Sequence, residues 1–504
     1  MESLLKYPVF IILKCAHFVR DLFSHSEDAY KLLLIPGLEG VRWNIGKWKA
    51  WMVFEKARKT TPAYKKFLQA HPNARVKLIN FIPDLSLLPI TDKESYIKKF
   101  SIEDRCINGK IPSRGVVIDE SSGTSGTPNN WVRGPVERNA VKQALQIAFH
   151  NQFGNKPIFL INAFALGPWA TGMNVSMSMV DVVMLKSTGP DIQKIVNTLN
   201  LFGPKYSYVI TGYPPFLKAL ADNTQVDWEK FDIITIFGGE GMSEGMRDYL
   251  SKAFKQSYGS YGASDLEINI AAETDFTIKL RKLLIHNQQA HDLLVRYKNG
   301  VLPVIFQYNP LDYFIETNEE GELVVTLCRE SNTSPKIRYN IHDTGYVVRM
   351  PELKKALREL GITDSQLKLP ENDLPLLFHF GRADMAVAYY GCKITPENIK
   401  EVTFALPNLA RIVNSFTIIT YEDDKVDKKL VLAFELEEGK TVTNEAEKFY
   451  KDIFENLKKI NQDYREASKM VPENNKPKLE FYSIGTGPFK VNDIRLKKHY
   501  IQVR

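Results

Sequence analysis

Between residues 150 and 260 the chain alternates short apolar runs with segments whose apolar residues recur at helical spacing. The apolar runs predict four strands, at residues 156–164, 181–187, 206–213 and 231–239. The other segments predict helices, at residues 190–201, 215–221 and 244–254. Strands that are apolar on both faces are typical of a parallel sheet covered by helices on both sides. The pattern therefore predicts an α/β fold with a doubly wound, mostly parallel sheet.

The segments before and after this alternation have different patterns of apolar and polar residues. Residues 1–75 have a helical pattern with a break at Pro62. From Gly300 onward, short strands separated by turn residues predict a β-rich subdomain. After Asp384 the pattern predicts a small α+β unit, with helices at 396–406 and 444–462, a hairpin between them and a closing strand at 479–482. We expect a large N-terminal domain, residues 1–381, and a small mobile C-terminal α+β domain, residues 385–504.

The composition excludes several classes of protein. Of 504 residues, 44% are hydrophobic and 25% charged, as in ordinary soluble globular proteins. The net charge of +7 is scattered, without a long basic run, so nucleic-acid binding is not expected. Four widely spaced cysteines form neither a zinc knuckle nor a disulfide framework, which favours a reducing cytoplasmic location.

The apolar segment 7–19 is interrupted by Lys14 and His17 and is too short to span a bilayer. It also lacks a good small-residue cleavage site for a signal peptide. We expect an amphipathic helix that packs on the body of the protein, with peripheral membrane contact as the alternative.

A loop rich in glycine and hydroxyl groups follows the short β-branched strand Val116–Ile118. Its sequence is SSGTSGTP, residues 121–128. Such a loop offers many backbone N–H groups and little side-chain bulk, as close contact with a phosphate requires. Because no lysine follows its last glycine, it is not a Walker A loop. The sequence indicates a phosphate site, and a solvated turn is the alternative.

A second segment, FGGEGMSEG, occupies residues 237–245 at the carboxyl end of a predicted strand. Ligands bind at that edge of open α/β sheets. The segment also matches G-x-S-x-G, the nucleophile elbow of serine hydrolases, with Ser243 as nucleophile and Asp343 with His379 or His499 as partners. No HGGG-type oxyanion loop precedes it, and the simpler alternative is that Ser243 caps a helix.

Further motifs follow in order along the chain. SYGSYGASDLE, residues 257–267, offers a tyrosine for stacking on a base and Asp265 as a metal ligand. KIRYNIHDTG, residues 336–345, places Asp343 just past a strand, where it could accept hydrogen bonds from ribose hydroxyls. GTGPFKVNDIRLKKHY, residues 485–500, presents Lys490 on a Gly/Pro loop.

The ordered set of motifs resembles the adenylate-forming superfamily of acyl-CoA synthetases, and within it the phenylacetate–CoA ligase-like branch. SSGTSGTP is similar to SSGTTGKP of that branch, FGGEGMSE to GGEPxSE, and YGASD to YGxSE. IRYNIHDTG resembles (I)RYRTxD, and GRADMAVAYYGCKITPENI resembles GRxDDxxxxxGxxxxPxxI. LPITDKESY is similar to the LPxTxK stretch. The resemblance covers the chain from about Trp51 to Lys490.

The resemblance implies a role for each matching residue. Lys490 would be the catalytic lysine, with Lys497 and Lys498 as substitutes, Asp265 would help bind Mg²⁺, and Asp384 would be the hinge. ATP or AMP would be bound by Ser122, Thr124, Ser125, Thr127, Gly239, Glu240, Gly241, Tyr261, Gly262, Ser264, Asp343 and Arg382. An apolar acyl pocket would be lined by Phe164, Trp169, Met173 and Tyr213.

The chain departs from the family pattern at three points. Thr127 stands where the loop often has lysine, Asp265 replaces a glutamate, and the ending around Lys490 matches only loosely. Some relatives carry a zinc cluster after YGxSE, but the corresponding region here has His286 and His291 without a cysteine. We therefore expect no structural zinc.

The resemblance implies ATP-dependent activation of an aromatic or medium-chain carboxylic acid to an acyl-adenylate. Transfer to a thiol, coenzyme A, would follow, and transfer to an amine or a carrier protein is the near alternative. Two further classes stay open, a serine hydrolase that uses Ser243 and a nonenzymatic nucleotide-binding relic. A homodimer is left open as well.

Overall fold

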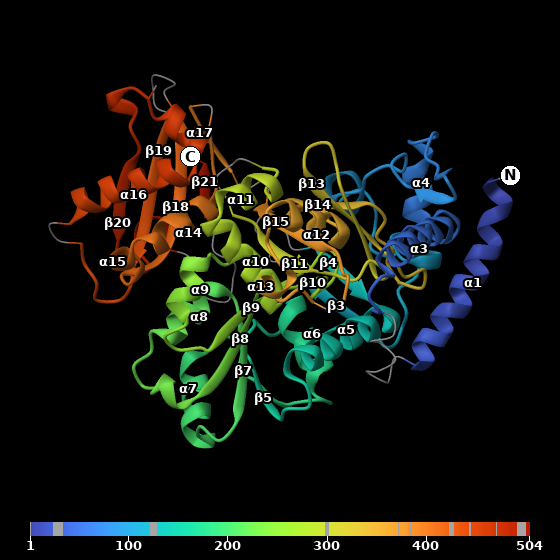
Figure 1. Ribbon diagram of the computed structural model, residues 1–504, viewed down its shortest axis with the longest axis horizontal. Helices are drawn as coiled ribbons and strands as arrows, with labels where there is room; N and C mark the ends of the chain where they lie inside the picture. The colour runs from blue at the N-terminus through green and yellow to red at the C-terminus, as the bar shows by residue number, and fades with distance from the viewer. Residues whose placement is uncertain are drawn as a thin grey trace.

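The computed structural model describes residues 2–23, 34–120, 129–297, 302–370, 372–382, 386–390, 392–422, 428–442, 445–469, 471–490 and 500–503. Figure 1 shows the N-terminal helix and the small C-terminal domain at opposite ends of the molecule, with the large sheet between them. No helix in these ranges combines the length and the apolar character that crossing a membrane requires.

Within the described residues, one eleven-stranded sheet forms the centre of the large N-terminal domain. Its parallel half consists of β5 (Ile158–Asn162), β6 (Met184–Ser187), β7 (Ser207–Gly212), β8 (Asp232–Gly238) and β9 (Gln256–Tyr261). Its antiparallel half consists of β10 (Ala271–Ala272), β11 (Val304–Gln307), β12 (Tyr313–Thr317), β13 (Glu322–Leu327), β14 (Tyr339–Val348) and β15 (Leu376–Arg382). The order across the sheet is β12-β13-β14-β15-β11-β10-β9-β8-β7-β5-β6.

Helices cover both faces of the parallel half. They are α5 (Pro135–Phe153), α6 (Ala170–Met179), α7 (Ile192–Phe202), α8 (Pro214–Ala221) and α9 (Glu244–Leu250). Alternate residues of β5 face opposite ways, so Ile158 and Leu160 join the core of α5 and α6, while Phe159 and Ile161 join that of α7 and α8. This is why the strands are apolar on both faces, as the sequence pattern predicts.

The antiparallel half is covered by two other groups of helices. One group comprises α1 (Glu2–Phe23), α3 (Glu39–Thr60) and α4 (Pro62–Gln69), and Phe10 of α1 packs on Trp48 and Trp51 of α3. The other comprises α10 (Asp275–His286), α11 (Gln288–Leu294), α12 (Met350–Glu359) and α13 (Asp364–Leu367). Pro62 separates α3 from α4, which confirms the predicted break.

Two hairpins and several helical turns complete this domain. The hairpins pair β1 (Lys77–Ile79) with β2 (Ile82–Asp84), and β3 (Val117–Glu120) with β4 (Asn130–Arg133). The turns are η1 (Lys93–Ile97), η2 (Ile107–Gly109) and η3 (Trp228–Lys230). Asp92 caps η1 through a hydrogen bond from the Ser95 N–H to its side chain. Strands β3 and β4 flank the predicted phosphate loop, whose residues 121–128 lie outside the described ranges.

The C-terminal domain is a separate four-stranded sheet with the order β20-β19-β18-β21. Its elements are β16 (Val387–Tyr389), β17 (Cys392–Ile394), α14 (Pro396–Ala405), α15 (Pro407–Ala410), β18 (Val413–Glu422), β19 (Lys428–Leu436), α16 (Ala446–Ile460), α17 (Gln462–Ala467), η4 (Glu473–Asn475), β20 (Lys478–Tyr482), η5 (Gly487–Phe489) and β21 (Ile501–Val503). One face of the sheet packs on α14 and α16, and the other receives Phe489.

The predicted fold class is confirmed: an α/β architecture with a large N-terminal domain and a small C-terminal α+β domain. Two details differ from the sequence prediction. The β-rich part is not a separate subdomain, because β11 to β15 continue the parallel half through β10. The predicted closing strand is β20, but β21 follows it and lies at the opposite edge of the small sheet, beside β18.

Candidate functional site

The carboxyl end of β8 leads into the glycine-rich segment that the sequence predicts on the adenine side. Gly239 has a φ of +85°, a backbone conformation that residues with a side chain rarely adopt. The segment ends at Ser243, whose Oγ accepts a hydrogen bond from the Met246 N–H at 3.1 Å. Ser243 therefore caps α9, and no hydrogen bond joins it to His379 within the described residues. The hydroxyl is engaged as a helix cap, which weakens the hydrolase alternative.

Asp343 and Arg382, the predicted ribose pair, are directly opposite each other on β14 and β15. Tyr261, at the end of β9, donates a hydrogen bond from its hydroxyl to Asp343 Oδ2 at 2.8 Å. His379 Nε2 lies 3.3 Å from the same oxygen. Strands that are far apart in sequence thus bring three of the predicted nucleotide residues, together with His379, to one place.

Asp343 is buried, with only 6% of the residue exposed. Burial by itself raises its pKa, but His379, Arg382 and the Tyr261 hydroxyl outweigh burial and hold the pKa below its ordinary value. Burial, with the Asp343 charge, keeps the pKa of Tyr261 well above its usual range. Tyr261 is therefore a neutral donor and Asp343 a charged acceptor, which suits hydrogen bonds from two neighbouring hydroxyl groups.

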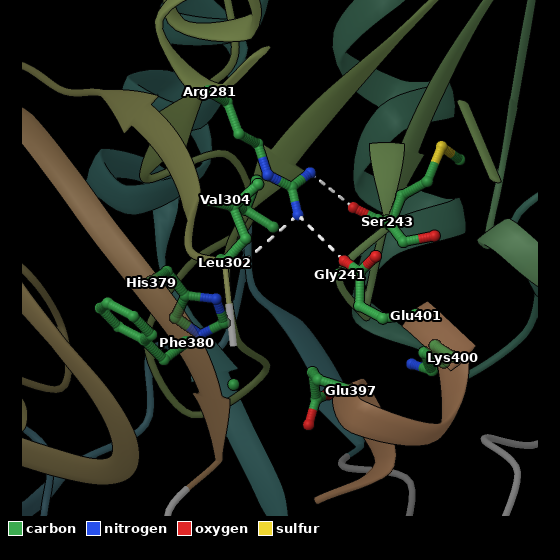
Figure 2. A pocket seen from close by; sticks show the side chains of 12 residues that line it. Gly241, Ser243, Arg281, Leu302, Val304, His379, Phe380, Glu397, Lys400 and Glu401 are labelled. Atoms are coloured by element: carbon green, nitrogen blue, oxygen red, sulfur yellow. Dashed lines mark hydrogen bonds and ion pairs between the residues drawn. The ribbon is translucent and has the colours of Figure 1, made fainter. Parts of the chain in front are cut away.

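Beside this cluster, a small cavity lies between the two domains (Figure 2). Its volume of about 30 Å³ has room for water molecules. In Figure 2, Glu401 of α14 faces Arg281, which donates to the Met242 carbonyl at 2.6 Å. The cavity is lined by Gly241, Met242, Ser243, Arg281, Leu302, Val304, His379, Phe380, Gly381, Glu397, Lys400 and Glu401.

Glu240, predicted to line the adenine, is held by two residues of the C-terminal domain. Lys400 of α14 forms an ion pair and hydrogen bond with Glu240 Oε2, and the Tyr500 hydroxyl donates to the same oxygen at 2.8 Å. Burial lowers the pKa of Lys400, but Glu240 and Glu397 outweigh it and raise that pKa above its ordinary value. Lys400 is therefore charged, and the contact is a genuine ion pair between the domains.

Asp265, the predicted Mg²⁺ ligand, is buried and already engaged. Its Oδ2 accepts a hydrogen bond from the Tyr339 hydroxyl at 3.0 Å and lies 3.2 Å from Lys93 Nζ. Among the described residues, no group of three or more His, Cys, Asp or Glu is arranged to hold a metal ion. A single carboxylate neutralised by a lysine does not fit a protein-held Mg²⁺ site. A metal role for Asp265 stays a prediction.

Arg133, which follows the phosphate loop on β4, ties that hairpin to the segment after β9. Its Nε lies 3.1 Å from Asp119 Oδ2, and its two terminal nitrogens donate to the carbonyl oxygens of Ser264 and Leu266. Asn174 of α6 donates to Asp119 Oδ2 at 3.3 Å. Arg133 thus links the hairpin to the segment after β9, and Asp119 extends the link to Asn174 of α6.

Lys490, the predicted catalytic lysine, is exposed and makes no hydrogen bond or ion pair within the described residues. It follows Phe489, which packs on Ile419, whereas the neighbouring Ile418 faces the α14 side of the sheet. Lys490 therefore lies on the face of the C-terminal domain away from α14. Ser122, Thr124, Ser125, Thr127, Asp384, Lys497 and Lys498 lie outside the described residues.

The predicted acyl-pocket residues follow the carboxyl ends of β5 and β7. Phe164 is buried beside Gly238, Trp169 precedes α6, Met173 lies within α6, and Tyr213 precedes α8. None of the four lines the cavity between the two domains. Their proposed contact with an acid stays a prediction.

No protein-family profile matches the chain, and no curated protein is significantly similar to it in sequence. Solved structures do resemble it. The structure of 2-hydroxyisobutyryl-CoA ligase in the postadenylation state, in complex with R3-HIB-AMP, has a TM-score of 0.63 at 13% identity over 90% of this chain and 88% of that one. The same ligase with 2-HIB-AMP and CoA in the thioesterification state has a TM-score of 0.52 at 14% identity, over 93% and 91% of the two chains. This chain shares its fold with 2-hydroxyisobutyryl-CoA ligase.

Sequence reasoning missed several residues of this region. The motifs indicate His379 only as a hydrolase partner, yet it lies beside the predicted ribose pair. They do not single out Lys400, Tyr500 or Arg133, because each acts through a partner at least 130 positions away in the sequence. A basic residue shortly after a motif segment, as Arg133 is after the loop, is a signal that could have indicated Arg133.

Proposed function

We propose that this protein is an ATP-dependent ligase that activates a carboxylic acid as an acyl-adenylate and passes the acyl group to a thiol. The observation that carries the proposal is the convergence of Tyr261, Asp343 and Arg382 beside the glycine-rich end of β8. Ligands of open α/β sheets bind at that edge. The shared fold with a CoA ligase supports the same conclusion.

The chemistry requires two anions to meet. A carboxylate oxygen attacks the α-phosphorus of ATP, the bond to the bridging oxygen breaks, and pyrophosphate leaves with the electron pair. Preplaced donors and cations lower such a barrier. The loop Ser121–Pro128 would supply donors to the phosphates, and Asp343, Arg382 and Tyr261 would fix the ribose. Lys490 would approach the developing charge after the C-terminal domain rotates.

The second step transfers the acyl group. A thiolate attacks the acyl carbon, the carbon–oxygen bond to AMP breaks, and a thioester and AMP result. Coenzyme A is the acceptor we propose, and an aromatic or medium-chain acid is the substrate class that Phe164, Trp169, Met173 and Tyr213 support.

Carboxylate-dependent exchange of labelled pyrophosphate into ATP tests the proposal. We expect exchange with some members of a panel of acids, and AMP rather than ADP when coenzyme A is added. Exchange without thioester formation would redirect the second step to an amine or a carrier protein. Failure of every acid to support exchange would refute the proposed function.

A further inference from the structure

A second cavity lies behind the β3–β4 hairpin, between α5, α6 and the segment after β9. It has a volume of about 10 Å³, which is room for one water molecule or one small polar group. Ala170 and Asn174 on its wall belong to the segment expected to line the acid. The lining is Asp119, Arg133, Glu137, Arg138, Val141, Ala170, Asn174, Glu267 and Ile268.

Glu267, which lines this cavity, is only 2% exposed, and only one of its two carboxylate oxygens accepts hydrogen bonds. Its Oε2 accepts hydrogen bonds from the Tyr313 hydroxyl at 3.0 Å and from Arg329. Its Oε1 has no hydrogen-bond partner within the described residues. A buried acceptor that lacks a donor destabilises the folded state, because water no longer satisfies it. One oxygen of a residue that lines the cavity therefore lacks a donor within the described residues.

The other polar groups of the wall are already engaged. Arg133 uses its three nitrogens on Asp119, Ser264 and Leu266, so it has little left for an anion. Glu137 accepts from the backbone N–H of Thr333 and Ser334. Burial, then the charge of Glu267, raises the pKa of Glu137, and both residues line the cavity. The cavity suits a hydrogen-bond donor and does not suit the reacting carboxylate.

We infer that the acid substrate carries a hydroxyl or amino group, and that this group enters the cavity and donates to Glu267 Oε1. The inference rests on the proposed function and names the substrate class of the same site. A site that hydrogen-bonds a substrate group discriminates strongly against the analogue that lacks it, since the buried acceptor is then left unpaired. Glu267 would thus determine specificity without touching the reacting carboxylate.

Matched pairs of acids test this inference on the wild-type protein. Pyrophosphate exchange is measured with phenylacetate and 4-hydroxyphenylacetate, and with hexanoate, 6-hydroxyhexanoate and 6-aminohexanoate. We expect kcat/KM to be at least about tenfold higher for an acid that carries a hydroxyl or amino group than for the matching unsubstituted acid. Comparison of 6-hydroxyhexanoate with 6-aminohexanoate then shows which of the two groups is the preferred donor. Equal or higher values for the unsubstituted acids would refute the inference and leave a buried water as the only occupant. No exchange with any acid would instead refute the proposed function.

The variant Glu267→Gln adds a second test, with Glu273→Gln as its matched control. Both glutamates are buried and pair with a buried arginine, Arg329 and Arg247 respectively, but Glu273 does not line the cavity. We expect both variants to lose stability, and only Glu267→Gln to lose the preference for the donor-bearing acid. If Glu267→Gln does not fold, binding of wild-type protein to the sulfamoyl-adenosine analogue of each acid, measured by calorimetry, replaces it. Equal affinities within a pair would overturn the inference.

Discussion

Lys400 of the C-terminal domain is paired with Glu240 at the end of β8, so the contact between the domains is made on the predicted adenine edge of the site. Tyr500, which is close to the C-terminus in sequence, donates a hydrogen bond to the same carboxylate. A second ion pair, Lys218 Nζ to Glu437 Oε1 at 3.0 Å, lies along the same boundary. Through Glu240, the glycine-rich segment after β8 is bound directly to the C-terminal domain. A movement of that domain would therefore break contacts of this segment.

Replacing Lys400 with methionine tests this coupling. The change removes one partner of a largely buried ion pair, and we expect a loss of about 1–3 kcal/mol of stability. Hydrogen exchange should accelerate in α14 and in residues 239–243. The control is Lys448→Met, an exposed lysine of α16. Equal exchange in both variants would show that the pair does not hold the domains together.

Arg133 is the subject of the second prediction. A lysine carries its three donors on one nitrogen and cannot span the three separate acceptors that the guanidinium reaches, so Arg133→Lys should free the segment of Ser264 and Leu266 from the hairpin. We expect a ten- to hundredfold loss of kcat in pyrophosphate exchange, with a smaller effect on KM for the acid. Faster hydrogen exchange in residues 262–268, measured without substrate, should accompany it. An unchanged exchange rate in that peptide would contradict the assigned role.

Ser243→Ala separates the ligase from the hydrolase alternative. The hydroxyl accepts only the capping hydrogen bond in the described structure, so its loss should cost about 1 kcal/mol and leave pyrophosphate exchange in place. Thr274→Ala, at the cap of α10, should cost about the same. A fluorophosphonate probe should not label the wild type. Labelling that disappears in Ser243→Ala would favour the hydrolase.

Lys336 gives a prediction on pH. It is buried against the Trp131 ring, and burial, with the charges of Arg105 and Arg133, lowers its pKa to about 7. The unfolded chain keeps this proton up to about pH 10. Between pH 7 and 10 the unfolded state therefore binds more protons, and stability rises with pH.

In Lys336→Met this contribution disappears. We expect the variant to gain most, relative to the wild type, below pH 7 and to lose that advantage as the pH rises to 10. The change across this range should be about 1 kcal/mol or more, measured by denaturant unfolding at each pH. A difference in stability that does not vary with pH would show that Lys336 is charged throughout.

Lys490→Ala tests the predicted catalytic lysine. Removing a cation that stabilises developing charge should lower the exchange rate by at least about a hundredfold. Lys478→Ala, an exposed lysine of β20, is the control and should keep the wild-type rate. If Lys490→Ala remains active, the same measurement on Lys497→Ala and Lys498→Ala decides between the substitutes.

Local patterns predicted much of the fold because they arise from local physics. The apolar runs that became β5 and β7 are buried on both faces, and that burial is visible in the sequence. The joining of the two halves of the sheet was not predictable, since β10 is only two residues long and carries no periodic signal. Its pairing with β9 and β11 is set by tertiary packing.

In the candidate site, too, some residues could be predicted from local motifs and others depend on tertiary packing. Asp343 and Arg382 could be named from motifs, and the register of β14 with β15 then places them opposite each other. His379 lies three residues before Arg382, and the sequence pairs it with Asp343 only in the hydrolase alternative, not as part of the nucleotide site. The motif assigns Glu240 to adenine, whereas its partners Lys400 and Tyr500 become visible only when the C-terminal domain is packed against β8.

The continuous sheet also constrains the order in which the chain can fold. Strand β15 lies between β14 and β11, and it is the last of the eleven strands to be synthesised. The sheet cannot be completed on the ribosome until residue 382 has emerged, and until then β11 and β14 each keep an open edge. Pairings between such distant segments form slowly and leave apolar edges exposed meanwhile. We therefore expect nascent chains of this protein to expose these two strand edges until β15 is in place.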